Sequence, residues 1–208
     1  MEDIQSTSSP VFDNNKHANS IKQEITRGII TLISALVIAV IIAALLRIFV
    51  FQLNIITSGS MSDTLHVGDT VLVSQIAAKK IRQLYLTDNN GSNIRGAVVV
   101  FHPPGKIKKD MDFVKRIIAL PEETISIRSN TVYINGAVLD ENYIRHFPNW
   151  WEADTSYDAV TVPAHSFFLL GDNRANSNDS RNWGAVSADN IVGRAVAVVW
   201  PPKNWKTL

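Results

Sequence analysis

Two serine hydroxyls flank a glycine in the sequence Thr-Ser-Gly-Ser-Met-Ser-Asp at residues 57–63. A glycine turn lets another chain's backbone approach closely, so Ser60 is a candidate nucleophile, with Ser58 near enough to assist from the side. A neutral hydroxyl is a weak nucleophile and needs an adjacent base. Without such a base, a stretch of this composition is typical of a solvated loop. The rest of the chain decides between these two interpretations.

Lys115 is the most unusual candidate for that base, because it lies inside an otherwise apolar strand pattern at residues 113–119. Alternation along a strand places it on the same face as Phe113 and Ile117. Desolvation on an apolar face lowers the pKa of a lysine and can make it a usable general base. The alternative interpretation is an edge-strand lysine whose amine reaches water.

Histidine is the other possible base, and the chain contains five: His17, His66, His102, His146 and His165. None of them has a recognisable catalytic or metal-ligand spacing. A fold can still assemble a Ser-His-Asp triad from distant positions, but nothing in the sequence selects one of the five.

A further polar feature is the segment Gly-Asp-Asn-Arg-Ala-Asn-Ser-Asn-Asp-Ser-Arg at residues 171–181, directly after a strand pattern at 167–170. Short polar side chains bond readily to their own backbone in turns. They could equally form a hydrogen-bonded network behind an active site. The composition favours neither interpretation.

Composition excludes several classes of function. Cysteine is absent, so disulfides, thiol catalysis and zinc–thiolate sites are excluded. The 20 basic and 19 acidic residues leave a net charge of +1, without the basic excess of a nucleic-acid-binding surface. A length of 208 residues is enough for one membrane anchor and one domain with its own core.

A long apolar segment comes first among the elements that must position these residues. Residues 28–46 carry no charge and would form roughly 28 Å of helix, close to the thickness of a hydrocarbon core. Basic residues are more frequent before the segment than directly after it, so the positive-inside rule places the N-terminus in the cytoplasm. We therefore expect a disordered cytoplasmic tail at 1–27, a transmembrane helix at 28–48 and an extracytoplasmic domain at 49–208.

The remainder of the chain predicts a mostly β domain. Stretches rich in β-branched or aromatic residues are separated by turn residues at 70–73, 97–101, 113–119, 124–128, 131–134, 167–170 and 191–200. No stretch of the domain shows convincing helical periodicity, and residues 85–95 have the composition of a loop. Trp150 and Trp151 fit either a core or the membrane interface.

In this order along the chain, the motifs closely resemble those of the type I signal peptidases, a family of membrane serine–lysine endopeptidases. The resemblance rests on the anchor and on Ser-Gly-Ser-Met at 58–61, Val-Lys-Arg-Ile at 114–117 and the polar segment at 171–181. It implies a signal-peptidase-like β fold and the removal of signal peptides from exported preproteins, with cleavage after small residues. No metal, cofactor or nucleic acid is implied.

The resemblance also implies roles for individual residues. Ser60 matches the nucleophile and Lys115 the general base. An acyl-enzyme would form between Ser60 and the substrate, and water activated by Lys115 would hydrolyse it. Ser58 would contribute its hydroxyl to the oxyanion hole beside the Ser60 backbone N–H, and Ser177 would orient the lysine amine. Two ion pairs would support the site, Asp172 with Arg116 and Asp179 with Arg181. Arg116 and Arg174 are expected to lower the pKa of Lys115 further.

Some positions depart from the family pattern. Asp63 stands where the family usually has proline, and Ala97, Glu122, Glu123 and Ala175 also differ from the usual residues. None of these changes removes a catalytic group. Two alternatives therefore stay open: a protein that binds signal peptides or assists export without cleaving them, and a serine–lysine peptidase with a different specialised substrate. The expected partners are preproteins, the lipid bilayer of a plasma or thylakoid membrane, and a nearby export translocon.

Overall fold

The computed structural model describes residues 14–87, 94–105, 111–144 and 156–208. The chain divides into two units, Met1–Leu46 and Arg47–Leu208, which are described separately below.

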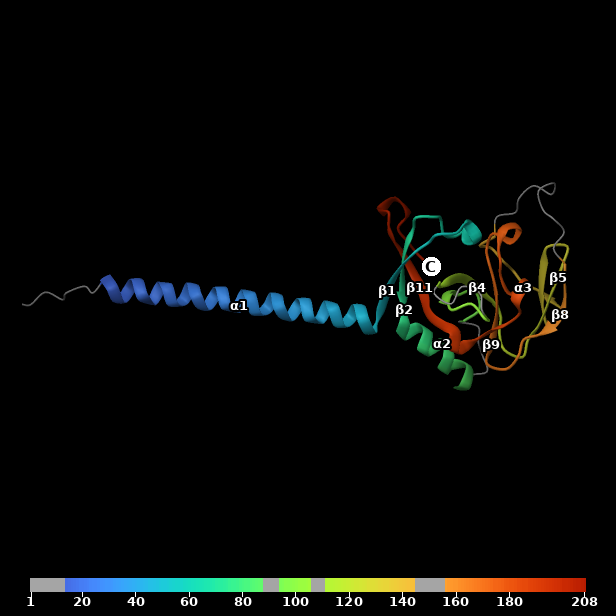
Figure 1. Cartoon of the computed structure of the whole chain (residues 1–208), viewed down its shortest axis with the longest axis horizontal. Helices are drawn as coiled ribbons and strands as arrows, with labels where there is room; N and C mark the ends of the chain where they lie inside the picture. The colour runs from blue at the N-terminus through green and yellow to red at the C-terminus, as the bar shows by residue number, and fades with distance from the viewer. Residues whose placement is uncertain (1–13, 88–93, 106–110, 145–155) are drawn as a thin grey trace, which may run out of the picture. The chain divides into compact units, whose positions relative to one another are not determined.

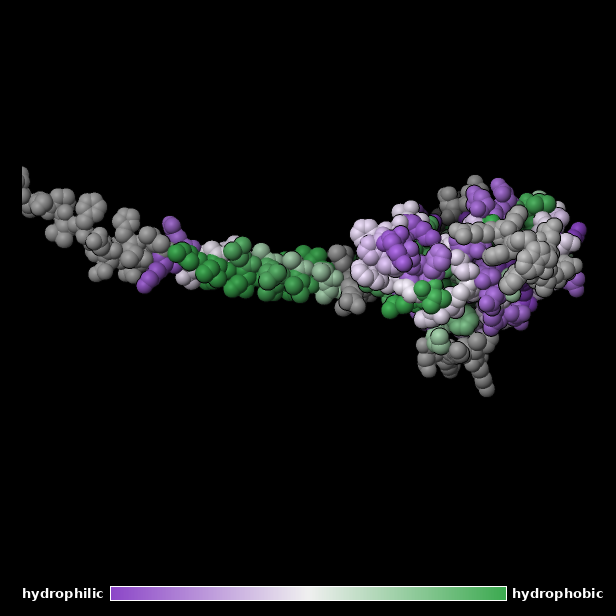
Figure 2. All heavy atoms as spheres, turned by 90° about the horizontal axis from the view of Figure 1, so that it is seen from above, coloured by the Kyte–Doolittle hydropathy of each residue, from purple (hydrophilic) through white to green (hydrophobic). Residues whose placement is uncertain are grey.

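The described part of the first unit belongs to a single long helix. Helix α1 (Asn14–Phe49) contains a stretch, Lys22–Leu45, with a mean hydropathy of 2.9 and no buried side chains, long and apolar enough to cross a membrane. Apolar side chains extend along the helix in the space-filling view (Figure 2). A helix with apolar side chains that nothing in the protein covers is suited to lipid. The single apolar N-terminal helix expected from the sequence is therefore present and is consistent with a single-pass anchor.

The helix begins earlier than the sequence indicates. Residues 14–27 were expected to belong to a disordered tail, but they are helical, which corrects that part of the prediction. Extending a helix from an existing apolar segment avoids the cost of a new nucleus, so polar residues can continue it. Residues 1–13 of the expected tail lie outside the described residues.

The second unit is mostly β, as predicted, and is built on two antiparallel sheets (Figure 1). The larger sheet has the order β1-β2-β11-β3-β4-β9-β10, with β12 paired to β11. Its strands are β1 (Phe51–Ile55), β2 (Thr70–Ser74), β3 (Val98–Phe101), β4 (Phe113–Ala119), β9 (Ser166–Leu170), β10 (Val186–Ser187), β11 (Ile191–Trp200) and β12 (Lys206–Thr207).

The smaller sheet has the order β7-β6-β5-β8. Its strands are β5 (Thr124–Arg128), β6 (Thr131–Ile134), β7 (Ala137–Val138) and β8 (Tyr157–Thr161). The predicted strands at 113–119, 124–128, 131–134 and 191–200 agree with the structure at both ends. Runs of β-branched and aromatic residues bounded by turn residues locate these strands, even where consecutive residues are buried, as in β4.

Helix α2 (Gln75–Thr87) was not expected, because no stretch of the domain shows convincing helical periodicity in the sequence. It includes residues 85–87, which were expected to be a loop. It packs against β11 through a narrow face on which Ala78 and Ile81 are buried, whereas Ile76 is exposed. So few buried positions among lysines give little periodic signal. Residues 88–93 of the expected loop, and Trp150 and Trp151, lie outside the described residues.

Short helical turns also lie between the strands. They are η1 (Gly59–Met61), η3 (Arg174–Asn176), α3 (Ser180–Trp183), η4 (Ala188–Asn190) and η5 (Pro202–Asn204). Turn η1 is held by Met61 and Leu65, which are buried in a core cluster with residues of β2, β3 and β11.

Strand β4 lies where three core clusters meet. Ile117 belongs to a cluster with α2 and β9, Val114 packs against the cluster that holds η1, and Ile118 belongs to the cluster shared with the smaller sheet. A strand packed on all sides has little freedom to shift. The two basic residues in its centre, Lys115 and Arg116, are consequently held in fixed positions.

Candidate active site

The hydroxyl of Ser60 and the amine of Lys115 meet between η1 and β4. Lys115 Nζ donates a hydrogen bond to Ser60 Oγ at 2.7 Å and another to the Val114 carbonyl at 2.9 Å. Both side chains belong to buried residues, with 8% of Ser60 and 3% of Lys115 exposed. A neutral amine in this position can accept the proton of the hydroxyl, which is the geometry required of a nucleophile and its base.

Burial lowers the pKa of Lys115 from 10.5 to about 8, because the charged form loses its hydration. The carboxylates of Asp179 and Asp172 act in the opposite direction and raise it. The expectation that Arg116 and Arg174 lower this pKa is therefore wrong. Both arginines are themselves paired, Arg116 with Asp172 and Arg174 with Glu141, so neither acts as an isolated positive charge on the lysine.

Ser58 lies on the open side of this pair. Its Oγ is 3.3 Å from Ser60 Oγ, its backbone is extended, and the residue is exposed to solvent. The Ser58 hydroxyl is thus accessible to a molecule that approaches Ser60. Both serines of the predicted Ser-Gly-Ser motif are brought to the same point in space.

Ser177 lies on the buried side. Its Oγ is inaccessible to solvent and has no hydrogen-bond partner among the described residues, and its bond to Lys115 is therefore absent from the structure. A Cβ added to Gly171 would lie 2.2 Å from Ser177 Oγ and 2.5 Å from the Ser60 carbonyl oxygen. Only glycine allows this approach, so Gly171 is a site residue that the sequence analysis missed.

The polar segment at 171–181 forms a turn and also takes part in a network of hydrogen bonds and ion pairs behind the candidate site. Arg116 Nε donates to Asp172 Oδ1 at 2.8 Å, and Thr64 Oγ1 donates to the same carboxylate at 2.5 Å. Arg181 Nε donates to Asp179 Oδ1 at 2.8 Å, and Asp179 also accepts from the Gly171 backbone. Both carboxylates are almost completely buried. The two alternatives left open for this segment are thus both realised.

Asn173 is a second site residue that the sequence analysis missed. Its Nδ2 donates to the Gly59 carbonyl at 3.0 Å, and its backbone N–H donates to the Ser60 carbonyl at 3.1 Å. Motif spacing gives no indication of this contact, because the two segments are 114 residues apart in the sequence.

The described histidines have carboxylates as ion-pair neighbours: His66 lies near Asp69, His102 near Asp112 and His165 near Asp189. No hydrogen bond joins any of these three side chains to Ser60 or Lys115 in the described parts of the chain. The side chain of His17 and all of His146 lie outside the described structure. Nor do the described residues contain a group of three or more His, Asp or Glu that could hold a metal ion.

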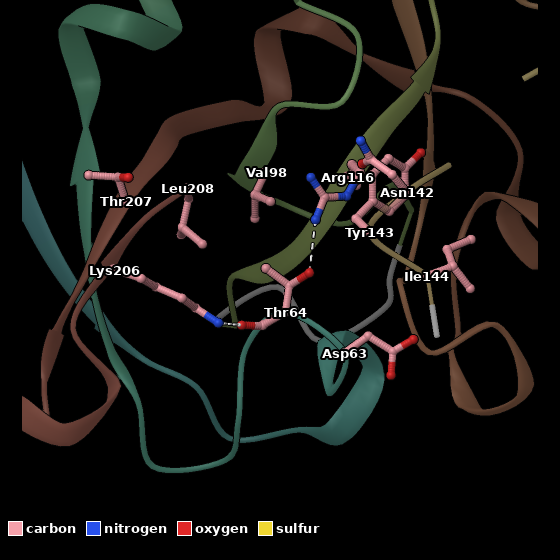
Figure 3. Close-up of a pocket in the computed structure, with 10 residues that line it drawn as sticks. All are labelled: Asp63, Thr64, Val98, Arg116, Asn142, Tyr143, Ile144, Lys206, Thr207 and Leu208. Atoms are coloured by element: carbon pink, nitrogen blue, oxygen red, sulfur yellow. Dashed lines mark hydrogen bonds between the residues drawn. The ribbon is translucent and has the colours of Figure 1, made fainter. Parts of the chain in front are cut away.

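A pocket of about 330 Å³ opens beside the turn that follows Ser60 (Figure 3). Asp63, Thr64 and Lys206 line it, and Arg116 donates from its wall to Thr64 Oγ1 at 3.0 Å. The guanidinium of Arg116 stacks on the Tyr143 ring, with its Cζ 4.0 Å from the ring centroid. Neither Ser60 nor Lys115 lines this pocket, so the candidate dyad faces a different space. The pocket contains Asp63, which departs from the family pattern.

Comparison with known proteins identifies the family. Residues 29–200 match the family model described as "Signal peptidase, peptidase S26". Signal peptidase I of Leptolyngbya laminosa is 39% identical over 169 residues, which cover 79% of this chain and 76% of the relative. Signal peptidase I T of Bacillus subtilis is 35% identical over 175 residues, which cover 80% of this chain and 83% of the relative.

Among solved structures, a signal peptidase I from Enterococcus faecalis is 32% identical and superimposes with a TM-score of 0.41, covering 49% of this chain and 95% of its own. The chain has one apolar N-terminal helix followed by a β-rich domain, and its relatives show it to be a peptidase. It belongs to the signal peptidase family, peptidase S26. Membership of this family supports signal-peptide removal as its activity.

Proposed function

We propose that the chain is a serine endopeptidase that removes N-terminal signal peptides from exported preproteins by means of Ser60 and Lys115. The single observation that carries this proposal is the 2.7 Å hydrogen bond between Lys115 Nζ and Ser60 Oγ. The buried amine has a pKa of about 8, so a substantial fraction is neutral near physiological pH.

The reaction begins when neutral Lys115 takes the proton of Ser60 Oγ as this oxygen attacks the scissile carbonyl carbon. The resulting tetrahedral intermediate collapses when the carbon–nitrogen bond breaks and Lys115 gives its proton to the departing amine. An ester then joins the signal peptide to Ser60. Water, deprotonated by Lys115, attacks this ester and releases the signal peptide with a carboxylate end.

The negative oxygen of the tetrahedral intermediate requires hydrogen-bond donors. The Ser60 backbone N–H and the Ser58 hydroxyl are the candidates, since Ser58 Oγ lies 3.3 Å from Ser60 Oγ on the exposed side. Donors at such a position typically contribute about 3–4 kcal/mol each to transition-state stabilisation. Ser177 is proposed to orient the lysine amine, to which its buried hydroxyl would turn when substrate binds.

The two buried ion pairs are proposed to hold the loop in place. Asp172 with Arg116 attaches the beginning of the loop to β4, and Asp179 with Arg181 closes its end. Because Asp179 and Asp172 also raise the pKa of Lys115, they keep this pKa from falling as far as burial alone would take it. The loop thus contributes to both the geometry and the electrostatics of the dyad.

The proposed membrane arrangement places residues 28–48 across the bilayer, the N-terminus in the cytoplasm, and the domain from residue 49 outside, in a plasma or thylakoid membrane. An apolar rim supports contact between the domain and the lipid. Its members are exposed large apolar side chains on β1, β11 and the neighbouring loops: Phe51, Leu53, Ile55, Val67, Trp200 and Trp205. Tryptophan is favoured at membrane interfaces. A domain at this surface could receive preproteins as they emerge from an export translocon.

Cleavage of a purified preprotein by the full chain in detergent, followed by sequencing of the new N-terminus, tests this function. We expect one cut, after a small residue, which is lost when the first and third residues before it are replaced by large ones. Failure to cleave any of several preproteins would contradict the proposal and favour a role in binding signal peptides. Cleavage unrelated to small residues would favour a different specialised substrate.

A further inference from the structure

The side chain of Asn173 connects the polar loop to the turn that carries the proposed nucleophile. Its two amide atoms have separate partners. Oδ1 accepts from the Asn176 backbone N–H at 3.2 Å, within the loop itself, whereas Nδ2 donates to the Gly59 carbonyl at 3.0 Å. The Asn173 backbone N–H adds a bond to the Ser60 carbonyl at 3.1 Å. Asn173 therefore makes one hydrogen bond to the carbonyl of the Gly59–Ser60 peptide group and one to the carbonyl of the next peptide group.

The Nδ2 bond acts on the peptide group whose N–H belongs to Ser60. A trans peptide is planar, and its C=O and N–H point in opposite directions. Holding the Gly59 carbonyl towards the polar loop therefore directs the Ser60 N–H away from it. This N–H is the backbone donor assigned above to the oxyanion hole.

Gly59 cannot hold this peptide group by itself. Nothing lies within 4 Å of the position that a Cβ on Gly59 would occupy, and a glycine has the widest choice of backbone angles. Apart from Asn173, its carbonyl accepts only from the Ser62 N–H, at 3.1 Å, among the described residues. The Ser62 bond lies within the turn itself, so Asn173 supplies the contact from outside the turn that helps to fix the direction of the Ser60 N–H.

We propose that Asn173 is a positioning residue for the oxyanion hole, whose amide donor fixes the Gly59–Ser60 peptide plane so that the Ser60 N–H points to the developing negative oxygen. This inference rests on the proposed peptidase function. It assigns a role in the reaction to a residue that touches neither substrate nor the Ser60 hydroxyl.

The variant Asn173→Asp isolates the donor. It retains Oδ1 for the Asn176 cap and the backbone bond to Ser60, but replaces Nδ2 with an oxygen that cannot donate. We expect kcat for preprotein cleavage to fall roughly 10–100-fold, because a donor held at the wrong angle loses much of its effect, while KM changes little. A peptide aldehyde ending in alanine should bind more weakly by a similar factor. Its adduct forms when Ser60 Oγ bonds to the aldehyde carbon, the carbonyl electrons move to oxygen, and Lys115 takes the hydroxyl proton.

Two controls separate the loss of the Nδ2 donor from the negative charge that Asn173→Asp adds. A new carboxylate also raises the pKa of Lys115, so each variant is assayed on the alkaline plateau of its own pH profile. Asn178→Asp adds the same charge to the same loop and retains the Oδ1 that accepts from Asn182 at 2.9 Å, so its plateau kcat should match the parent. Asn173→Ala removes the donor without adding a charge and should also lose kcat, and it decides the question if Asn173→Asp unfolds at the assay temperature.

Plateau kcat values of both Asn173 variants within about threefold of the parent, or a loss confined to KM, would overturn the inference. A parent that cleaves no preprotein, or a Ser60→Ala variant that cleaves as the parent does, would instead overturn the proposed function, and this inference with it. The parent and Ser60→Ala measurements therefore distinguish the two failures.

Discussion

Lys115 Nζ and Ser60 Oγ lie 2.7 Å apart although the two residues are separated by 55 positions in the sequence. The lysine is fixed by β4, where three core clusters meet, and the serine by a turn whose next residue, Met61, is buried. The backbone at both residues is therefore held by neighbours in packed core clusters. The same burial that holds the amine also lowers its pKa to about 8. Burial of Lys115 thus accounts both for the position of its amine and for its lowered pKa.

The pH dependence of cleavage follows from this pKa. Below about 8 the folded protein holds Lys115 protonated, and a protonated amine cannot accept the Ser60 proton. We therefore expect kcat/KM to fall about tenfold for each pH unit on the acidic side and to level off on the alkaline side. Steady-state kinetics of preprotein cleavage between pH ~6 and ~10 measure this dependence of kcat/KM on pH. A flat profile, in a protein shown to stay folded over that range, would exclude Lys115 as the base.

Stability should show the cost of burying the same amine. A pKa that is 10.5 in the unfolded chain and about 8 in the folded chain corresponds to a penalty of about 3 kcal/mol. The penalty is fully present below pH 8, where both states are charged, and disappears as pH rises through 10.5. Lys115→Met should therefore be inactive but more stable near neutral pH, by roughly 1–3 kcal/mol after the loss of two hydrogen bonds.

Denaturant unfolding of the parent and of Lys115→Met at several pH values measures this difference. The stability advantage of the variant should shrink as pH rises towards 10.5, because the unfolded parent then also loses its proton. A variant less stable than the parent at neutral pH would show that the lysine contributes more through its contacts than its burial costs.

Removal of the Ser58 hydroxyl tests the oxyanion hole. Ser58→Ala should lower kcat by roughly 100-fold with a much smaller change in KM, because this donor would act chiefly on the charged intermediate. Ser58→Thr retains a hydroxyl and should keep most of the activity. Ser62→Ala removes a hydroxyl from the same turn and serves as the matched control. Equal activity of Ser58→Ala and Ser62→Ala would exclude Ser58 from the oxyanion hole.

The Arg116–Asp172 pair should be important for folding. Asp172→Ala leaves the Arg116 guanidinium buried without its partner, and breaking a buried pair in this way costs about 3–5 kcal/mol. Asp189→Ala removes the exposed partner of His165 and should cost less than about 1 kcal/mol. Chemical unfolding of the full chain in detergent measures the free energy of unfolding of the parent, Asp172→Ala and Asp189→Ala. Similar losses for the two variants would show that the buried pair has no special structural role.

Several strands of the domain were predictable because β-branched and aromatic residues gather in them and turn residues separate them. The seven residues of β4 and the ten of β11 agree with this pattern at both ends. Helix α2 was not predictable, since only Ala78 and Ile81 on its described surface are buried. The helical extension over residues 14–27 was also missed, because polar residues carry no periodic signal and simply continue the apolar helix.

The sequence predicted the titratable residues of the candidate site better than it predicted the contacts that support them. Lys115 attracts attention from sequence alone, as a charge inside an apolar strand. The contacts of Gly171 with Ser177 and of Asn173 with Gly59 depend on the approach of segments that are far apart in the chain. The predicted effect of neighbouring charges on the pKa of Lys115 had the wrong direction for a related reason. The sequence indicated nearby arginines, but the fold pairs those arginines with carboxylates and places Asp172 and Asp179 near the amine.

Single substitutions of the dyad test the central claim most directly. One purified preprotein is incubated with the parent, Ser60→Ala and Lys115→Ala at a pH above 8, with the fold of each variant checked by thermal unfolding. The account predicts that the parent cleaves after a small residue and that both variants lose cleavage while remaining folded. Cleavage that survives in folded Lys115→Ala would contradict the account and place the base elsewhere, with the histidines to be examined next.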